Sequence, residues 1–171
     1  MLLVAATPKF AAQAIRKIGE LAWKPTTIIS NVSASISGVL EPAGREASTG
    51  VISSQYLKDS TDPALKDDPG FNEWLAFMNK YMPDANKTDW LNVYGYTIAQ
   101  TLVTVLKSAG DDLTRANVIK QATGLKDVRL SMLINGTALN NSSEHFTPMT
   151  SLQLIKFDGT RWVSFGELVR N

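Results

Sequence analysis

The sequence predicts an α/β protein in which short parallel strands are flanked by helices, and three observations support this fold class. The chain opens with a uniformly apolar run, LLVAA at 2–6, which is typical of a parallel strand buried on both faces. An amphipathic helical pattern follows, and the β-branched run TTIIS at 26–30 comes next. Strand, helix and strand in this order form a right-handed crossover, which makes the two strands neighbours in one sheet.

The first helix is predicted to begin at Thr7 and Pro8, because a threonine cap followed by proline at the first helical position is a common helix start. A glycine-interrupted helix is expected over 36–47, and VISSQYL at 51–57 reads as a third strand. The apolar face of the first helix is predicted to consist of Phe10, Ala14, Ile15, Ile18 and Leu21.

The middle of the chain changes character at KDSTDPALKDDPG (58–70), whose aspartates and prolines predict a crossing or surface loop. Helical spacing then returns at 71–82 and 89–110, the second of which ends at a glycine. Thr114 is predicted to cap a third helix. The aromatic residues of this region form either a ligand cage or, as their helical stripes favour, core contacts: Trp74, Trp90, Tyr94 and Tyr96.

The last third of the chain is β-like. The run VRLSMLI at 128–134 predicts a strand, and a polar loop follows it. Asp158-Gly159 lies between two alternating runs, which is the strongest hairpin signal in the sequence.

Length and composition are those of a globular protein. The chain has 171 residues, 44% of them hydrophobic and 19% charged, which is enough to bury a sizeable core. Seventeen basic and sixteen acidic side chains give a formal net charge of +1, so nothing indicates nucleic acid or an anionic membrane as a partner. The absence of cysteine excludes disulfides, thiolate catalysis and zinc–cysteine sites.

The first residues do not match a targeting segment. A signal peptide needs a basic start, an apolar stretch of about 7–15 residues and a cleavage site. Here the apolar run stops at Ala6, nothing basic precedes it, and Pro8 and Lys9 follow. No stretch supplies the roughly 20 apolar residues of a membrane helix. We therefore expect no membrane insertion, and we interpret 2–6 as an internal strand.

Catalytic and metal-binding patterns are sparse. The chain lacks G-x-S-x-G, G-x-x-x-x-G-K-[ST] and G-x-G-x-x-G. His145 is the only histidine, and its place in a polar loop favours a structural role over catalysis. Asp67 and Asp68 precede a proline and a helix, which favours capping over a cation site. We therefore expect no enzyme activity, no cofactor and no metal.

Two turns at the carboxyl ends of the predicted strands are better candidates for a site, because ligands of open α/β sheets bind outside these ends. They are AAT at 5–7 and SNVSAS at 30–35, and the first leads into a helix N-terminus that can hold an anionic group. The alternative is that the threonine only caps its helix and the serines only belong to a loop. The candidate ligand contacts in these turns are Ala6, Thr7, Asn31 and Ser33.

Four segments together resemble one protein family. They are ATPKFAAQAIRKIGELAWKPTTIIS, EPAGREASTGVISSQYLKDSTDPA, YGYTIAQTLVTVLKSAGDDLTRANVI and MTSLQLIKFDGTRWVSFGELV. In this order they resemble the second half of the branched-chain amino-acid-type (leucine/isoleucine/valine-binding-like) periplasmic solute receptors of ABC transporters. The helix pattern G-Y-x-x-A-x-x-L and the hairpin F-D-G-x-R-W-V-x-F-G-E are the most specific parts. The resemblance covers nearly the whole chain.

The resemblance implies the type I periplasmic binding protein fold, whose two α/β lobes hold a ligand in a cleft and close by a hinge motion. Residues 1–57 would belong to the carboxyl-side lobe, and 149–171 would return to it as a terminal hairpin. Residues 58–148 would supply helices and edge strands of the amino-side lobe, with crossings near 58–63 and 146–151. The two-lobe architecture would be incomplete, without its amino-terminal half.

The resemblance also implies ligand contacts. Thr7 and Leu91 match positions at which the amino-acid receptors place aromatic residues, and Asn31 matches their acidic partner for the ammonium group of the ligand. An amide cannot pair with an ammonium as a carboxylate does. An organic acid, an aromatic acid, an amide or a similar small solute is therefore favoured over a free α-amino acid.

The implied function is that of a periplasmic receptor that delivers a small solute to the permease of an ABC importer. The solute would be a branched-chain amino acid or a related small carboxylate or amide, and the mechanism would be capture and lobe closure without chemistry. A ligand-sensing regulator with the same fold, of the amide-responsive type, is the alternative. A hydrolase that uses His145 is a third hypothesis.

Overall fold

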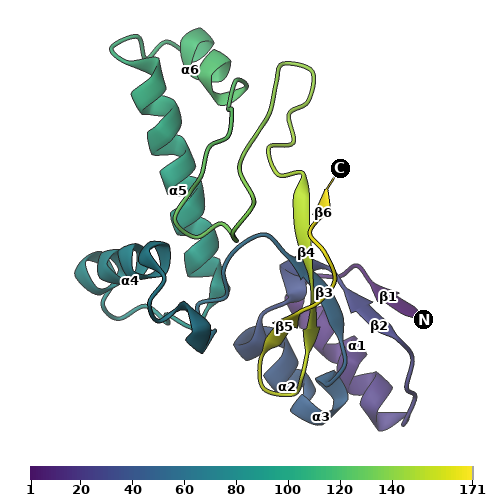
Figure 1. The fold of residues 1–171 in the computed structure, drawn as a ribbon. Coiled ribbons are helices and arrows are strands. Elements are labelled where there is room, and N and C mark those ends of the chain that lie inside the picture. The colour runs from purple at the N-terminus through teal and green to yellow at the C-terminus, as the bar shows by residue number, and fades with distance from the viewer. Residues whose placement is uncertain (171) are drawn as a thin grey trace.

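The protein is built around one mixed β-sheet with a separate group of helices beside it, and the computed structural model describes residues 1–170 (Figure 1). The order along the sheet is β1-β2-β3-β4-β5, with β6 paired to β4. Neighbouring strands from β1 to β3 are parallel, whereas β4 is antiparallel to β3, β5 and β6. The strands are β1 (Leu2–Val4), β2 (Thr27–Ile29), β3 (Ile52–Gln55), β4 (Ser151–Phe157), β5 (Trp162–Ser164) and β6 (Val169–Arg170).

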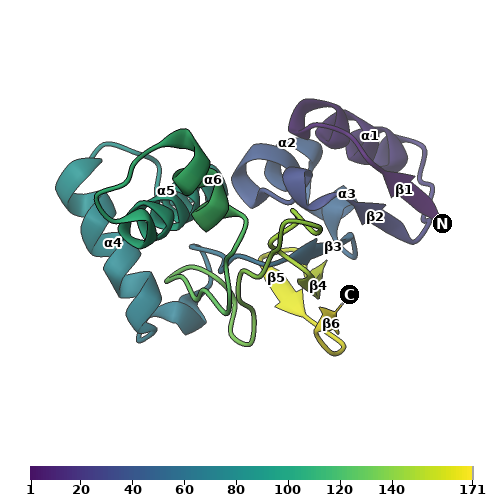
Figure 2. The same cartoon turned by 90° about the horizontal axis from the view of Figure 1, so that it is seen from above.

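The helices fall into two groups. Those between β1 and β3 cover one face of the sheet, and the opposite face of β1 and β2 carries none (Figure 2). The second group stands apart from the sheet, at the left of Figure 1. The first group is α1 (Pro8–Glu20), the 3₁₀ turn η1 (Asn31–Ser33), the π-helical turn η2 (Ile36–Leu40), α2 (Glu41–Ala43) and α3 (Arg45–Ser48). The second is the 3₁₀ turn η3 (Pro63–Leu65), α4 (Pro69–Tyr81), α5 (Trp90–Ala109) and α6 (Arg115–Ala122).

Most predicted elements are confirmed. The opening strand, helix and strand form the parallel pair β1 and β2 joined by α1. The helix expected over 36–47 is divided at Gly44, whose φ of 103° lies in the left-handed region that favours glycine. The hairpin at Asp158-Gly159 joins β4 to β5, where the Asp158 amide donates to the Arg161 carbonyl at 3.1 Å.

The predicted helix caps differ in how they act. Asp68 Oδ1 accepts from the Phe71 amide at 2.8 Å, and Thr114 Oγ1 accepts from the Asn117 amide at 3.4 Å. Thr7 stands at the N-cap position of α1, but its side chain makes no capping hydrogen bond. Its carbonyl accepts from the Phe10 amide instead, at 3.0 Å. The start of α1 therefore depends on backbone geometry and on the proline that follows Thr7.

Two hydrophobic clusters form the core. The first lies between α1, η2 and the sheet, and the second joins α4, α5 and the segment 125–139. The largest fully buried side chains of the first are Phe157, Ile15 and Leu40, and those of the second are Trp74, Met78 and Met132.

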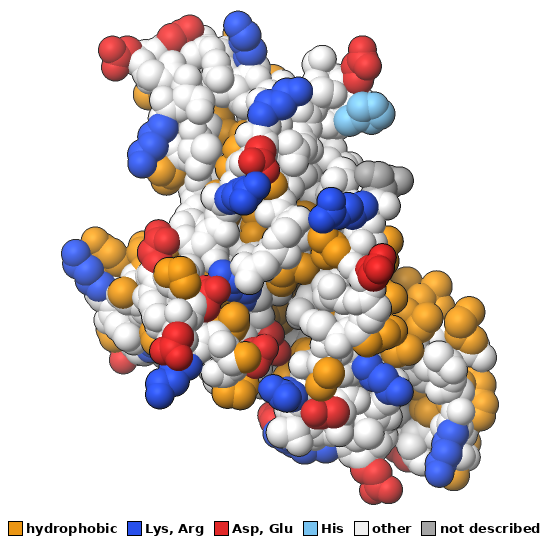
Figure 3. All heavy atoms as spheres, in the orientation of Figure 1, with side chains coloured by type: hydrophobic (Ala, Val, Ile, Leu, Met, Phe, Trp, Pro, Cys, Tyr) orange, Lys and Arg blue, Asp and Glu red, His pale blue; other side chains and the backbone are white. Residues whose placement is uncertain are grey.

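The apolar face predicted for α1 is only partly correct. Ile15 is fully buried, whereas Phe10 and Leu21 are about three-fifths exposed. The buried face is centred instead on Ala11 and Ala12, whose small side chains let the helix approach the sheet closely. Met1, Leu3 and Phe10 are exposed apolar residues near the N-terminus. Hydrophobic side chains gather on this part of the molecule, at the lower right of Figure 3.

Helix α5 also carries an exposed apolar face, defined here by Leu91, Tyr94, Ile98, Leu102 and Leu106. The opposite face, with Val93, Thr97 and Val105, is buried in the second cluster. Among the described residues, no helix is long and apolar enough to cross a membrane.

The prediction of a strand over 128–134 is wrong, because this segment forms no regular strand. Leu133 makes one isolated antiparallel bridge with Leu57, next to hydrogen bonds from the Lys58 amide to the Met132 carbonyl and from the Ile134 amide to the Tyr56 carbonyl. The apolar residues of the segment instead fill the second cluster from a loop. The edge strands expected between 58 and 148 are accordingly reduced, in the described structure, to isolated bridges.

A buried ion pair fixes α4 to the segment that leaves β3. Lys58 Nζ lies 2.7 Å from Asp68 Oδ1 and donates to the Ser131 carbonyl at 2.9 Å. The two side chains are only 9% and 16% exposed. Burial acts to raise the pKa of Asp68, but the hydrogen bonds from Lys58 and from the Phe71 amide outweigh it and hold the pKa below its ordinary value. The pair therefore ties together three segments at the junction of the two clusters.

Candidate functional site

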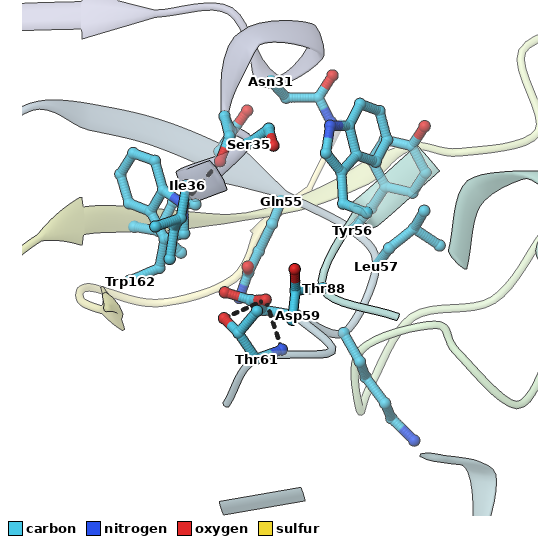
Figure 4. A pocket seen from close by; sticks show the side chains of 15 residues that line it. Asn31, Ser35, Ile36, Gln55, Tyr56, Leu57, Asp59, Thr61, Thr88 and Trp162 are labelled. Carbon is cyan, nitrogen blue, oxygen red and sulfur yellow. Dashed lines mark hydrogen bonds between the residues drawn. The ribbon is translucent and has the colours of Figure 1, made fainter. Parts of the chain in front are cut away.

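A cavity with about 520 Å³ of empty space, part of it open to solvent, lies where the two hydrophobic clusters meet (Figure 4). It opens at the carboxyl ends of β2 and β3, which is the ligand position expected for an open α/β sheet. The lining residues come from the turn after β2, the end of β3 and the segment after it, the start of α5, and the hairpin of β4 and β5.

The turn after β2 contributes Asn31 and Ser35. Asn31 opens the 3₁₀ turn and is half-buried, with its amide directed toward the cavity beside Tyr56 (Figure 4). Ser35 Oγ accepts from the Gly38 amide at 3.0 Å and thereby caps the π-helical turn. Burial raises the pKa of the Tyr56 phenol, and Tyr94 adds to this, while a hydrogen bond with Asn31 partly offsets it. Tyr56 is therefore a neutral hydroxyl at physiological pH.

Two tryptophans line the cavity, Trp90 from the second hydrophobic cluster and Trp162 from the first. Trp90 is the first residue of α5, and Asp89 fixes that helix start because its Oδ1 accepts from the Leu91 amide at 3.0 Å. Trp162 begins β5, and its Nε1 donates to the Ala34 carbonyl at 2.8 Å, which holds the indole against the turn after β2. The cavity thus has aromatic walls supplied by both clusters.

The charged lining residues are Lys58 and Asp59, both in the segment after β3. Lys58 is committed to Asp68 and Ser131, as described above. Asp59 Oδ1 accepts from the Thr61 amide at 2.9 Å and from the Thr61 hydroxyl at 2.8 Å. Within residues 1–170, Asp59 forms no ion pair, and no three His, Asp or Glu side chains are grouped to hold a metal ion.

The structure brings one of the five candidate ligand contacts, Asn31, into the cavity. Ser33 is fully buried, and its hydroxyl donates to the Ala6 carbonyl at 2.6 Å, so this pair joins the two strand-end turns to each other. Thr7 is exposed at the start of α1, and Leu91 is 56% exposed beside the lining residue Trp90. The roles of these residues in ligand binding stay predictions.

The sequence-based candidates missed most of the lining. Trp90 is adjacent to the proposed Leu91, so a shift of one position would have found it. Trp162 and Asp59 lie in segments that were interpreted only as a hairpin and a surface loop. The lining residues absent from the candidate set include Ser35, Gln55, Tyr56, Asp59, Thr61, Thr88, Trp90 and Trp162.

His145 is not among the residues that line this cavity. It is exposed in the loop before β4, where its backbone amide donates to Ser142 Oγ at 3.1 Å. None of the lining residues is a sequence neighbour of His145. The contacts of His145 are those of a residue that stabilises its loop, and they give no support to the hydrolase hypothesis.

Comparison with known proteins identifies the class to which this fold belongs. The family model described as "Periplasmic binding protein" matches residues 1–160, and the chain therefore belongs to this family. No curated protein sequence matches the chain.

Solved structures share the fold at low sequence identity. A branched-chain amino acid ABC transporter protein from Thermus thermophilus with bound valine superposes with a TM-score of 0.78 at 16% identity, over 99% of this chain and 45% of that one. A possible leucine/isoleucine/valine-binding protein from Rhodopirellula baltica SH 1 gives 0.75 at 15%, over 96% and 42%. A fatty acid ABC transporter substrate-binding protein from Thermomonospora curvata gives 0.66 at 24%, over 99% and 43%. The chain thus spans less than half the length of the structures that it matches.

Proposed function

We propose that the chain is part of the solute-binding component of an ABC importer, and that the solute lies in the cavity between the two hydrophobic clusters. The observation that carries the proposal is the position of this cavity: it lies at the carboxyl ends of parallel strands and is walled by residues of both clusters. Family membership and the transport proteins among the similar structures support it.

The mechanism proposed is capture by residues of two bodies, without covalent chemistry. Asn31 and Trp162 belong to the side of the first cluster, and Thr88 and Trp90 to the side of the second. A solute that contacts both sides stabilises the arrangement in which they are close, because a ligand shifts an equilibrium toward the state that it binds more tightly. Closure of this kind would present a ligand-bound shape to a permease, and both the permease partner and the periplasmic location are part of the proposal.

The lining favours a small solute with an apolar or aromatic body. Trp90, Trp162 and Ile36 offer apolar surface, and Asn31 and Tyr56 offer neutral hydrogen-bonding groups. Neutral partners of this type fix orientation through hydrogen bonds while the apolar walls supply most of the burial. Branched-chain amino acids and related small carboxylates and amides therefore remain the proposed solute classes.

The test uses the indole signals of the four tryptophans in ¹H–¹⁵N spectra of the chain. Trp90 and Trp162 line the cavity, whereas Trp74 is fully buried in α4 and Trp23 is half-exposed beyond the end of α1. L-valine, L-leucine and 4-methylvalerate added to about 10 mM would detect affinities near 1 mM, or about −4 kcal/mol. We expect shifts at Trp90 and Trp162 and not at Trp23. Silence at both lining residues with every probe, in a folded sample, would refute the proposal.

A further inference from the structure

The charge distribution in the cavity is one-sided. Fifteen residues line it, and the charged ones are Lys58 and Asp59 (Figure 4). The Lys58 ammonium lies 2.7 Å from Asp68 Oδ1 and is hydrogen-bonded to the Ser131 carbonyl, with a side chain only 9% exposed. Its positive charge is thus matched by Asp68. The cavity is left with the negative charge of Asp59.

The Asp59 carboxylate is held in place by only one of its oxygens. Both hydrogen bonds from Thr61 go to Oδ1, and no hydrogen bond within residues 1–170 goes to Oδ2. In Figure 4 the carboxylate lies beside Gln55 and Thr61 at the floor of the cavity. A carboxylate that is oriented by neutral donors and keeps a second oxygen free can accept a strong charge-assisted hydrogen bond from a ligand.

The nearby cation Arg161 is shared between other carboxylates. Arg161 and Asp59 both line a second, neighbouring groove. The Arg161 guanidinium, however, lies 3.8 Å from Asp62 and 3.9 Å from Asp158. The Arg161 side chain is also half-exposed, so solvent screens its charge. It therefore does not neutralise Asp59 in the cavity.

Aromatic side chains line the same cavity as this carboxylate. Tyr56, Trp90 and Trp162 line the same cavity, and Trp90 is held edge-on to Tyr94 with ring centroids 5.6 Å apart. Aromatic faces attract cations through the ring quadrupole, by about 0.5–1 kcal/mol at exposed sites and about 2 kcal/mol when desolvated. A cavity lined by a carboxylate and aromatic rings favours an organic cation and disfavours an anion.

We propose that Asp59 is a specificity-determining residue that receives an ammonium group of the solute, whose apolar body lies between Trp90 and Trp162. This rests on the proposed function, because it assigns one end of the solute in the same cavity. The substrate class is a small organic cation, or a zwitterion whose ammonium end faces the segment after β3. Among the proposed solute classes this favours the amino acids, because a solute that places a carboxylate at this end meets the uncompensated charge of Asp59 and binds more weakly.

The experiment compares three probes with the same branched apolar body: isopentylamine, isopentanol and 4-methylvalerate, which are cationic, neutral and anionic at neutral pH. Titrations of the ¹⁵N-labelled chain are followed at the indole signals of Trp90 and Trp162. We expect isopentylamine to bind at least about tenfold more tightly than 4-methylvalerate, a difference of about 1.4 kcal/mol. The alcohol should lie between them.

The variant Asp59→Asn removes the charge and retains an oxygen for the two hydrogen bonds from Thr61. It should abolish the preference for the amine over the carboxylate. The matched control is Asp111→Asn, which makes the same change in net charge at an exposed residue beyond the end of α5. The control should keep the preference of the unaltered chain.

The possible failures are distinguishable. Equal shifts from the amine and the carboxylate, or an unchanged preference in Asp59→Asn, would overturn the assignment of Asp59 and leave the cavity as the solute site. No shift at Trp90 or Trp162 from any probe, in a folded chain, would overturn the proposed function and this inference together. Should Asp59→Asn fail to fold, the ranking of the three probes in the unaltered chain still decides.

Discussion

Replacing Asp68 with asparagine should weaken the junction between the segment after β3 and helix α4. Asp68 Oδ1 lies 2.7 Å from Lys58 Nζ and also accepts from the Phe71 amide at 2.8 Å. Asparagine is as good a helix cap as aspartate, so the variant keeps the cap and removes only the charge. The Lys58 ammonium, 9% exposed, is then left with the Ser131 carbonyl as its acceptor at 2.9 Å.

The expected loss follows from the burial of this pair. Removing one partner of a buried ion pair typically costs about 3–5 kcal/mol, because the other charge remains buried without compensation. The retained Ser131 contact and the 16% exposure of Asp68 reduce this, so we expect about 2–3 kcal/mol for Asp68→Asn. Asp68→Ala should lose about 1 kcal/mol more with the cap. The double variant Lys58→Met with Asp68→Asn should recover part of the loss, since no buried charge remains.

The effect should also depend on pH. The pKa of Asp68 in the folded chain lies below its ordinary value of 3.8, although burial alone would raise it, because the hydrogen bonds from Lys58 and Phe71 prevail. A lowered folded-state pKa gives stability that is fully present above the unfolded pKa and is lost as the pH falls through the folded one. The stability difference between the unaltered chain and Asp68→Asn should therefore be constant near neutral pH and shrink in acid.

The assay is urea unfolding followed by tryptophan fluorescence, with hydrogen exchange of the α4 amides to detect opening of that region alone. The local readout is needed because the core consists of two clusters, and a structure of this kind can open one region without unfolding the other. Asp67→Asn is the matched control, since Asp67 is the exposed neighbour of Asp68 and its loss should stay within about 0.5 kcal/mol. If Asp68→Asn and Asp67→Asn destabilise equally, the ion pair does not anchor α4.

Further substitutions test other parts of the structure. Gly70→Ala should destabilise strongly in urea unfolding, because a Cβ there would lie 2.1 Å from the Ser131 carbonyl oxygen, whereas Gly95→Ala on α5 meets open space and should stabilise by about 0.5–1 kcal/mol. Gly159→Ala should lower the melting temperature, because φ is 103° in the β4–β5 hairpin. The exposed apolar face of α5 should cause the chain to self-associate, which sedimentation velocity would detect as species larger than the monomer. Leu102→Lys should reduce this association, because Leu102 is 53% exposed on that face; an unchanged association would contradict the role of this face.

The local elements could be predicted from sequence because their signals are local. The helix predicted over 89–110 is observed at Trp90–Ala109, fixed by an aspartate cap and a glycine end that are adjacent to it in the chain. The Asp158-Gly159 hairpin needs only its turn residues and two alternating runs. Neither prediction depends on what lies elsewhere in the fold.

The segment 128–134 shows where this reasoning fails. Its apolar residues have the composition of a strand, but a strand also requires a partner of matching length. The structure offers Leu133 one isolated bridge to Leu57, and the buried Met132 is satisfied by packing against the second cluster. Composition reports that a residue is buried and does not report whether a helix, a strand or a loop buries it.

Only part of the candidate site could be predicted, because most of its residues are brought together by the fold and not by local sequence. The rule that ligands bind at the carboxyl ends of parallel strands led to Asn31, which does line the cavity. Trp90 and Trp162 reach the same cavity from segments that are more than seventy residues apart, so no sequence pattern joins them. Asp59 was dismissed with the polar loop around it, because its surroundings are set by the fold and not by its neighbours in sequence.

The segment after β3 explains how adjacent residues of opposite charge serve different purposes. The Leu57–Leu133 bridge and the bond from the Lys58 amide to the Met132 carbonyl hold this segment in an extended form, and successive side chains of an extended chain point to opposite sides. The Lys58 ammonium is therefore directed to α4 and Asp68, while the carboxylate of Asp59 remains with the cavity. Exchanging the two residues, with Lys58→Asp and Asp59→Lys together, would place an ammonium in the cavity and a carboxylate beside Asp68. The double variant should therefore lose the anchor of α4 and reverse the charge preference of the site.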